Sequence, residues 1–138
     1  MLASVLVVLG LPAAVAAALR FRDRQVLCVA GDGDFLMNGQ ELATAAQYGA
    51  KPLVIVMDNQ EYGTIRTHQE REYPGRVSGT QLKNPDFAAM AEAFGGFGVR
   101  VERDADVPAA VDAALKAVQE EGRFALIHLI VEQRVKAY

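Results

Sequence analysis

The sequence predicts an α/β domain with a doubly wound, mostly parallel sheet and helices on both of its faces. Two observations carry this prediction. Continuous apolar runs, which suit strands buried on both faces, occupy residues 25–30, 53–57 and 124–131. Segments with apolar residues three or four positions apart, which suit amphipathic helices, separate these runs. This alternation is typical of a parallel sheet built from strand–helix–strand units.

The first nineteen residues admit more than one interpretation. Residues 1–19 contain no charged side chain and are followed by three arginines within five residues, as in a signal peptide or a membrane span. Pro12 interrupts the run, however, and no Lys or Arg precedes it. We therefore expect no membrane anchor, a strand or extended piece over residues 5–9, and a helix from Pro12 to Phe21 with the proline at its first position. Whether residues 1–9 belong to the native fold stays open.

Helix caps and breakers place the remaining elements. We expect strands over residues 25–30, 53–57, 97–101 and 124–131, and helices over 38–48, 86–94 and 107–121. The polar stretch over residues 60–83 is predicted to be a long irregular excursion with about one helical turn. Loops of this length are often functional.

Length and composition indicate a single domain over residues 1–138. The chain is 51% hydrophobic and 22% charged, which excludes a disordered chain. Its 14 Lys and Arg against 17 Asp and Glu give a net charge of −3 with no basic stripe, so we expect no nucleic-acid partner. The one cysteine, Cys28, permits no internal disulfide, which favours a cytoplasmic location.

Polar side chains follow two of the predicted strands. Gly31-Asp32-Gly33-Asp34 ends the first run, and Asp58-Asn59-Gln60-Glu61 ends the second. Asp32 and Asn59 are 27 residues apart, the length of one strand–helix–strand unit, so we expect them at the same edge of the sheet. A carboxylate and an amide oxygen suit Mg²⁺ or Ca²⁺. The glycines would let the backbone turn sharply and approach a phosphate group.

These motifs resemble a known family. Gly31-Asp32-Gly33, followed one unit later by Asp58-Asn59, is similar to the thiamine diphosphate-binding motif written GDG…NN. Residues 10–131 resemble the C-terminal, diphosphate-binding domain of acetolactate synthase-like enzymes. The resemblance implies thiamine diphosphate and Mg²⁺ as cofactors. It also implies lyase or transferase chemistry, namely decarboxylation or carboligation of a 2-oxo acid such as pyruvate.

The resemblance also implies roles for individual residues. Asp32, Asn59 and the backbone carbonyl of Glu61 would hold Mg²⁺, which bridges to the diphosphate. The implied cofactor-binding residues are Gly31, Gly33, Asp34, Met37, Tyr62 and Gly63. Backbone amides of Gly33, Asp34 and Gly63 would contact phosphate oxygens, while Met37 and Tyr62 would lie near the cofactor. No catalytic residue is identified.

The sequence departs from the family pattern in three ways. Asp58 stands where the family usually has Asn, although Asn59 occupies the ligand position. Val7 and Val8 replace the Met and a Gly of a Gly-x-Met-Gly-x-Gly segment beneath the cofactor rings, which puts ring binding in doubt. Family enzymes also carry a pyrimidine-binding domain whose glutamate activates the cofactor, and 138 residues cannot contain it. We therefore expect half of an active site, a possible pyrimidine-binding domain partner, and self-association as a homodimer.

Other functions stay open at this stage. The chain could be a stand-alone protein that uses the metal site for hydrolysis, a non-catalytic binding module, or a relic that folds without activity. Neither histidine lies in a metal-binding or hydrolase motif. We expect His128 to be a hydrogen-bonded core residue and His68 to be exposed.

Overall fold

The structure is a computed structural model that describes residues 2–132, with side chains from residue 9 onward. Its strands are β1 (Leu27–Gly31), β2 (Leu53–Asp58), β3 (Phe97–Val101) and β4 (Ala125–Ile130). They form one sheet in the order β1-β2-β4-β3, and each neighbouring pair is parallel. The predicted α/β fold with a parallel sheet is confirmed.

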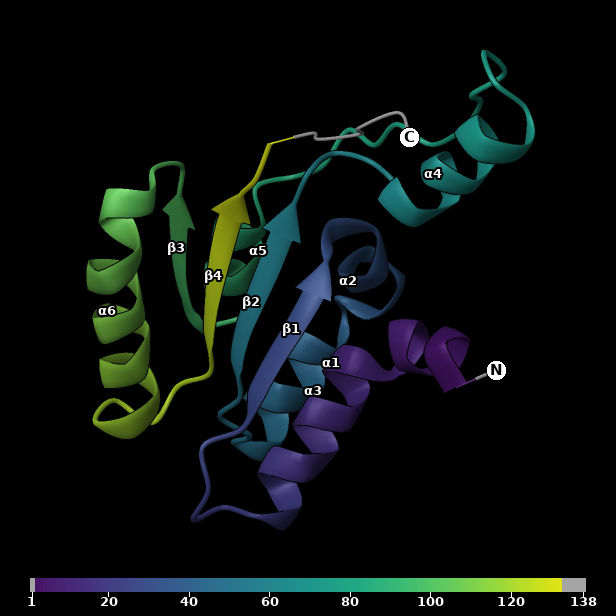
Figure 1. The fold of residues 1–138 in the computed structure, drawn as a ribbon. Helices are drawn as coiled ribbons and strands as arrows, with labels where there is room; N and C mark the ends of the chain where they lie inside the picture. The colour runs from purple at the N-terminus through teal and green to yellow at the C-terminus, as the bar shows by residue number, and fades with distance from the viewer. Residues whose placement is uncertain (1, 133–138) are drawn as a thin grey trace.

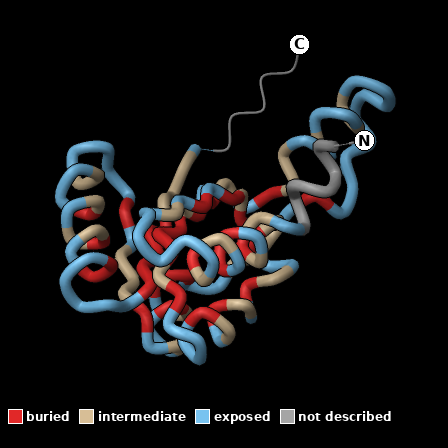
Figure 2. Tube along the Cα trace, turned by 90° about the horizontal axis from the view of Figure 1, so that it is seen from below, coloured by how far each residue is buried: buried red, intermediate tan, exposed pale blue. Residues whose placement is uncertain are grey.

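Helices cover both faces of this sheet (Figure 1). The helices are α1 (Leu2–Arg20), α2 (Asp32–Asn38), α3 (Glu41–Tyr48), α4 (Gly63–Glu72), α5 (Phe87–Ala93) and α6 (Val107–Gln119), with a 3-10 turn η1 (Asp104–Asp106) before α6. Helices α1, α2, α3 and α5 share one hydrophobic core with one face, and α6 packs on the other. Figure 2 shows the buried positions gathered between these layers.

The alternation of side chains along the strands produces these two cores. On β2, Val54 and Val56 face α1 and α3, whereas Leu53 joins the core beneath α6. Because most side chains on both faces of β2 are covered, with Met57 as the exposed exception, its sequence is a continuous apolar run and not an alternating one.

Residues 2–20 form one helix, so the predicted strand over residues 5–9 is wrong. Pro12 lies inside α1 and not at its first position, although proline removes one hydrogen bond there. Buried side chains recur at helical spacing on either side of it, at Leu11, Ala14, Val15 and Ala18, and their packing outweighs the missing bond. The side chains of Val7 and Val8, and so the ring-binding question, lie outside the described residues.

Two helices differ from the prediction, and the helices as a set bear on membrane insertion. Helix α2 starts directly after β1, where we predicted only a turn. Helix α4 has 10 residues where about one turn was expected, because it buries none of its residues and so shows no apolar periodicity. In the described part of the chain, none of the helices has the length and hydropathy that a membrane crossing requires.

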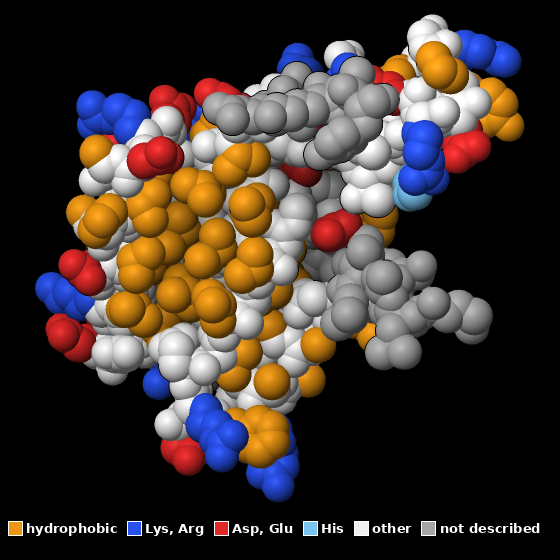
Figure 3. Space-filling view, in the orientation of Figure 1, with side chains coloured by type: hydrophobic (Ala, Val, Ile, Leu, Met, Phe, Trp, Pro, Cys, Tyr) orange, Lys and Arg blue, Asp and Glu red, His pale blue; other side chains and the backbone are white. Residues whose placement is uncertain are grey.

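One part of the sheet is left open. Helix α6 covers β3 and β4, but on the same face the side chains of Leu27, Val29 and Met57 are 56%, 57% and 43% exposed. Figure 3 shows hydrophobic side chains gathered over this face. We call these three residues the open face. Among the described residues, β1 pairs only with β2, so its other edge is free as well.

Helix α5 begins with a side-chain cap. The Asp86 carboxylate accepts hydrogen bonds from the backbone N–H groups of Ala88 and Ala89 at 2.9 and 3.1 Å, which satisfies two donors that the helix itself cannot. The bond from Ala89 and a smaller contribution from His128 outweigh partial burial and hold the pKa of Asp86 below its ordinary value.

Asp86→Ala should destabilise the protein by about 1 kcal/mol at neutral pH, measured by urea denaturation. A carboxyl with a lowered folded pKa contributes stability above its unfolded pKa, which is about 3.9, and loses it as the pH falls through the folded value. The difference between the variant and the wild type should therefore shrink in acid. Asp86→Ser, which keeps a neutral cap, should destabilise the protein less than Asp86→Ala does, and the difference between these two variants should not depend on pH. A constant deficit for Asp86→Ala across the titration would contradict this account.

Candidate functional site

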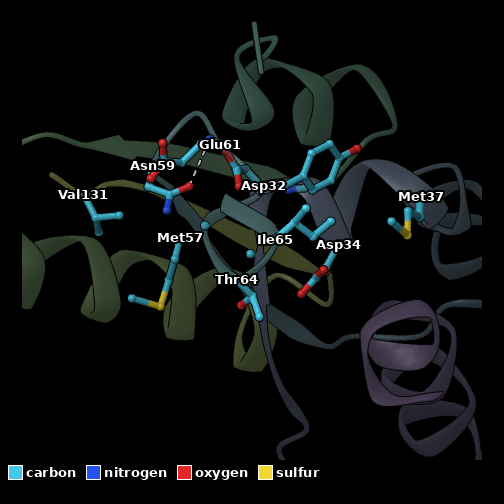
Figure 4. A pocket seen from close by; sticks show the side chains of 13 residues that line it. Asp32, Asp34, Met37, Met57, Asn59, Glu61, Thr64, Ile65 and Val131 are labelled. Carbon is cyan, nitrogen blue, oxygen red and sulfur yellow. Dashed lines mark hydrogen bonds between the residues drawn. The ribbon is translucent and has the colours of Figure 1, made fainter. Parts of the chain in front are cut away.

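A cavity of about 580 Å³ lies at the carboxyl ends of β1 and β2, beside α2 and α4 (Figure 4). Thirteen residues line it: Gly31, Asp32, Gly33, Asp34, Met37, Met57, Asn59, Glu61, Tyr62, Gly63, Thr64, Ile65 and Val131. All nine residues singled out from the sequence are among them. The register of the sheet explains this, because Gly31 pairs with Met57, so the segments that follow the two strands, with Asp32 on one and Asn59 on the other, reach the same cavity.

Asp32 is buried, with 2% of its surface exposed. Its Oδ1 accepts a hydrogen bond from the Gly33 N–H at 2.9 Å. Its Oδ2 accepts from the Gln60 N–H at 2.8 Å and from Asn84 Nδ2 at 2.6 Å. Burial raises the pKa of Asp32 above its ordinary value, and the neighbouring Asp58 carboxyl adds to the shift.

Asp58 lies beside Asp32, and its pKa is shifted in the opposite direction. Burial by itself would raise its pKa, but hydrogen bonds from His128, Asn84 and the Gln60 N–H together hold the pKa below its ordinary value. The site thus contains two buried carboxyl groups of unequal acidity, and Asp58 is the one that stays ionised more readily.

Each oxygen group predicted to bind a metal keeps an acceptor position that no donor of the described protein residues uses. A carboxylate has roughly four acceptor positions, and Asp32 uses three of them for protein donors. Asn59 Oδ1 accepts one bond, from the Glu61 N–H at 3.1 Å, and the Glu61 carbonyl accepts one, from the Gly63 N–H at 2.9 Å. Each of these carbonyls keeps a second lone pair. The donor set, a carboxylate with two neutral oxygens, suits Mg²⁺ or another hard cation.

The side chain of Glu61 is not available as a ligand. It is buried and paired with Arg66, whose Nη1 lies 2.7 Å from Glu61 Oε2, and Arg66 Nε also contacts Glu70 at 3.0 Å. Only the backbone carbonyl of Glu61 remains for a cation. The same ion pair attaches α4 to the end of β2.

The glycines act differently from the prediction. Neither Gly31 nor Gly33 has a positive φ, so neither makes the sharp turn we expected. Gly33 is needed because the Tyr62 ring lies against it: a Cβ there would be 2.7 Å from Tyr62 Cδ1. The Gly33 N–H donates to Asp32, so a phosphate would have to replace that bond. Asp34 is partly buried, and burial raises the pKa of its carboxyl.

Gln60, between the predicted ligands Asn59 and Glu61, has a left-handed backbone with φ 59°. This conformation is costly for a residue with a side chain and is most often found at functional sites. Flanking hydrogen bonds maintain it: the Leu82 N–H donates to the Gln60 carbonyl, and the Tyr62 N–H donates to the Thr80 carbonyl, both at 2.8 Å. The loop that carries two predicted ligands is therefore fixed.

Several residues of the site were missed in the sequence. Met57, Thr64 and Ile65 adjoin predicted residues, and their proximity to Asp58 and Gly63 was an available signal. Val131 and Asn84 had no such signal, because tertiary structure alone brings them here. His68 is exposed and bonds to Arg71, as expected of a surface residue, and Cys28 is buried within β1.

The profile of the family described as "Thiamine pyrophosphate enzyme, C-terminal TPP binding domain" matches residues 6–129. The chain belongs to this family. The predicted resemblance, and thiamine diphosphate as the cofactor of the family, are thereby confirmed.

Individual relatives agree with the family assignment. The acetolactate synthase large subunit of Parasynechococcus marenigrum is 45% identical over 94 residues, which are 67% of this chain and 15% of that protein. The acetolactate synthase isozyme 2 large subunit of Escherichia coli is 38% identical over 125 residues, 90% of this chain and 22% of that protein. The crystal structure of benzoylformate decarboxylase from Polynucleobacter necessarius superimposes with a TM-score of 0.82 at 29% identity, covering 94% of this chain and 25% of that one. The chain thus spans a quarter or less of the length of each.

Gly33→Ala should destabilise the protein by about 1–3 kcal/mol, because the added methyl group overlaps the Tyr62 ring. Thermal or urea denaturation measures this. Gly31→Ala is the matched control, since the nearest atom to its Cβ lies at 3.5 Å, and it should cost less. In a Tyr62→Ala background the penalty of Gly33→Ala should largely vanish. An unchanged penalty in that background would show that the ring is not the cause.

Proposed function

We propose that this domain anchors the diphosphate of thiamine diphosphate through a divalent cation, Mg²⁺ by preference. The observation that carries the proposal is the buried Asp32 carboxylate, which shares one cavity with Asn59 and Glu61. Asp32, Asn59 Oδ1 and the Glu61 carbonyl would hold the cation. A diphosphate would otherwise meet Asp32 as a like charge, so the cation must mediate its binding.

The chain's own residues would bind and orient the cofactor. The bound cofactor supplies an ylid and an electron sink, as thiamine diphosphate does in general. Gly63 leaves space for the side chain of Asn59, because a Cβ on Gly63 would lie 3.2 Å from Asn59 Nδ2. Apolar groups of Met37, Met57 and Ile65 line the same cavity.

The substrate class that we propose is a 2-oxo acid, acted on by decarboxylation or carboligation. The names of the relatives support this, since benzoylformate is a 2-oxo acid and acetolactate is a carboligation product. The activating glutamate would come from a pyrimidine-binding domain that acts together with this one. A cytoplasmic location is part of the proposal and agrees with the single, buried Cys28.

Thiamine diphosphate with Mg²⁺ should raise the melting temperature, and EDTA should abolish the effect. A ligand at a hundred times its Kd stabilises the folded state by about 2.7 kcal/mol, which corresponds to a shift of several degrees at roughly 2–4 °C per kcal/mol. Asp32→Asn should remove the shift. The asparagine is preferable to alanine because Asp32 accepts three hydrogen bonds that alanine would leave unpaired.

Asp34→Asn is the control for this experiment. It removes the same charge from the same cavity but no proposed metal ligand, so the shift should remain. Equal shifts in the wild type and Asp32→Asn, or a shift that persists in EDTA, would disprove the proposed site.

We further propose that the open face joins two copies of the chain as a homodimer. Parallel sheets are normally covered on both faces, and Leu27 and Val29 of β1 are each more than half exposed at a free strand edge. A twofold axis beside β1 would pair the two edges antiparallel and bring the two open faces together into one continuous surface.

Light scattering at tens of micromolar, on the order of ordinary assay concentrations, should report a dimer. Val29→Glu, at the centre of the open face, should yield a monomer. Val77→Glu is the control, because Val77 is also exposed but lies in the segment after α4. A wild-type chain that is monomeric at this concentration would refute the dimer.

A further inference from the structure

Behind the cavity, one amide group separates two buried carboxylates. Asn84 Nδ2 donates to Asp32 Oδ2 at 2.6 Å and to Asp58 Oδ1 at 2.7 Å. An amide nitrogen has two hydrogens, so each carboxylate receives one of them. The Gln60 N–H is shared in the same way, at 2.8 Å from Asp32 Oδ2 and 3.0 Å from Asp58 Oδ1. Two donors therefore lie between the two negative groups.

The orientation of the Asn84 amide is set by these carboxylates. Its Oδ1 is buried and has no hydrogen-bond partner among the described residues, which is unfavourable for a carbonyl oxygen. The opposite orientation would place that oxygen against Asp32 and Asp58 together. A residue that only stabilised the fold would gain from satisfying its own oxygen. Asn84 instead directs its donors to the carboxylates.

His128 holds Asp58 from the other side. It is 1% exposed, and its Nε2 lies 2.8 Å from Asp58 Oδ2. Its Nδ1 accepts the Phe87 N–H at 3.3 Å and also lies 3.5 Å from Asp86 Oδ1. In the tautomer that the bond from Phe87 requires, Nε2 carries the ring hydrogen and donates it to Asp58. The ring comes from β4 and its partner from the start of α5, so Asp58 is fixed by two regular elements and not by a loop.

These contacts form one chain from the helix α5 to the metal site. The Phe87 N–H fixes His128, His128 fixes Asp58, and Asn84 links Asp58 to Asp32. The shared Gln60 N–H connects the same carboxylates to the strained loop that carries Asn59 and Glu61. The residues on both sides of the proposed cation site are thus held by this series of hydrogen bonds.

We propose that Asn84 and His128 are positioning residues of the metal site. Neither contacts the cation: Asn84 orients the Asp32 carboxylate so that its free acceptor position faces the cavity, and His128 fixes the Asp58 carboxylate against which Asn84 and the Gln60 N–H are aligned. This inference rests on the proposed function. Partners of this kind behind a metal ligand usually contribute 10–100-fold, as an order of magnitude, to metal affinity.

Titration with Mn²⁺ followed by electron paramagnetic resonance tests the inference. Mn²⁺ takes the same oxygen ligands as Mg²⁺, and its Kd is measured on the full chain with thiamine diphosphate present, below the melting temperature. Asn84→Ala should weaken Mn²⁺ binding by about 10–100-fold. Asn84→Ser, with a single donor, should have an intermediate effect. Lys83→Ala, at the exposed neighbouring position, should bind as the wild type does.

A pair of variants at His128 separates positioning from packing. Glutamine can place an amide N–H near the position of Nε2, whereas asparagine reaches only the position of Nδ1. His128→Asn should therefore weaken Mn²⁺ binding by about 10-fold or more, and His128→Gln should restore much of it. Both lose the ring contact with Phe87, whose centroid is 4.9 Å away, so both lower the melting temperature.

The outcomes distinguish this inference from the function on which it rests. If the wild type binds no Mn²⁺ with thiamine diphosphate, the proposed function is wrong. If the wild type binds and the folded Asn84 and His128 variants bind equally well, with only a lower melting temperature, the two residues are structural and the inference is overturned. If Asn84→Ala does not fold, Asn84→Ser and the His128 pair decide the question by the same criterion.

Discussion

The burial of two carboxyl groups at the ends of adjacent parallel strands is the constraint around which the site is organised. Because Gly31 of β1 pairs with Met57 of β2, the residues that follow them, Asp32 and Asp58, lie next to each other. Asp32 and Asp58 are 2% and 3% exposed, so water does not screen their repulsion. The contacts around them, from Asn84, His128 and the Gln60 N–H, supply hydrogen-bond donors in place of that water.

This arrangement also links stability to ligand binding. Burial raises the pKa of Asp32, so the ionised form of this carboxyl is less favourable in the folded state than in the unfolded chain. A cation at the proposed site would offset this cost, because the buried charge would then serve as its ligand. The strained backbone of Gln60 lies in the same loop. A buried carboxyl and a strained backbone of this kind are both common at functional sites.

The sequence predicted the sheet well because its two central strands, β2 and β4, are covered on both faces along most of their length. The β2 run LVIVM has no other plausible position than the centre of a parallel sheet, and Gly49, at φ 66°, ends α3 as a cap should. The two helices that were predicted wrongly, α1 and α4, lack an amphipathic pattern of apolar and polar residues. Apolar residues throughout α1 show no contrast between its faces, and polar residues throughout α4 show none either. In both helices the periodicity on which prediction relies is missing.

The site divides in the same way. Asp32 and Asn59 could be paired from the sequence because one strand–helix–strand unit separates them and the topology of such units is fixed. Asn84 is 52 residues from Asp32 and lies between the predicted excursion over residues 60–83 and the predicted helix over residues 86–94, so nothing local indicated a role in the site. His128 lies among apolar residues of β4, and its burial was foreseen while its contact with Asp58 was not. Contacts between elements that are far apart in the sequence follow no fixed spacing, so the sequence does not reveal them.

Helix α4 has a consequence for the motions of the molecule. None of its residues is buried, and among the described side-chain contacts its link to the site is the Arg66–Glu61 ion pair at its first turn. Opening this helix exposes almost no apolar surface, so it requires far less free energy than opening the sheet. Its backbone amides should exchange with solvent through local unfolding while those of β2 exchange only when the whole domain unfolds. The wall of the cavity formed by Thr64 and Ile65 is thus the part that can move aside to admit a ligand, whereas the floor formed by the strand ends stays in place.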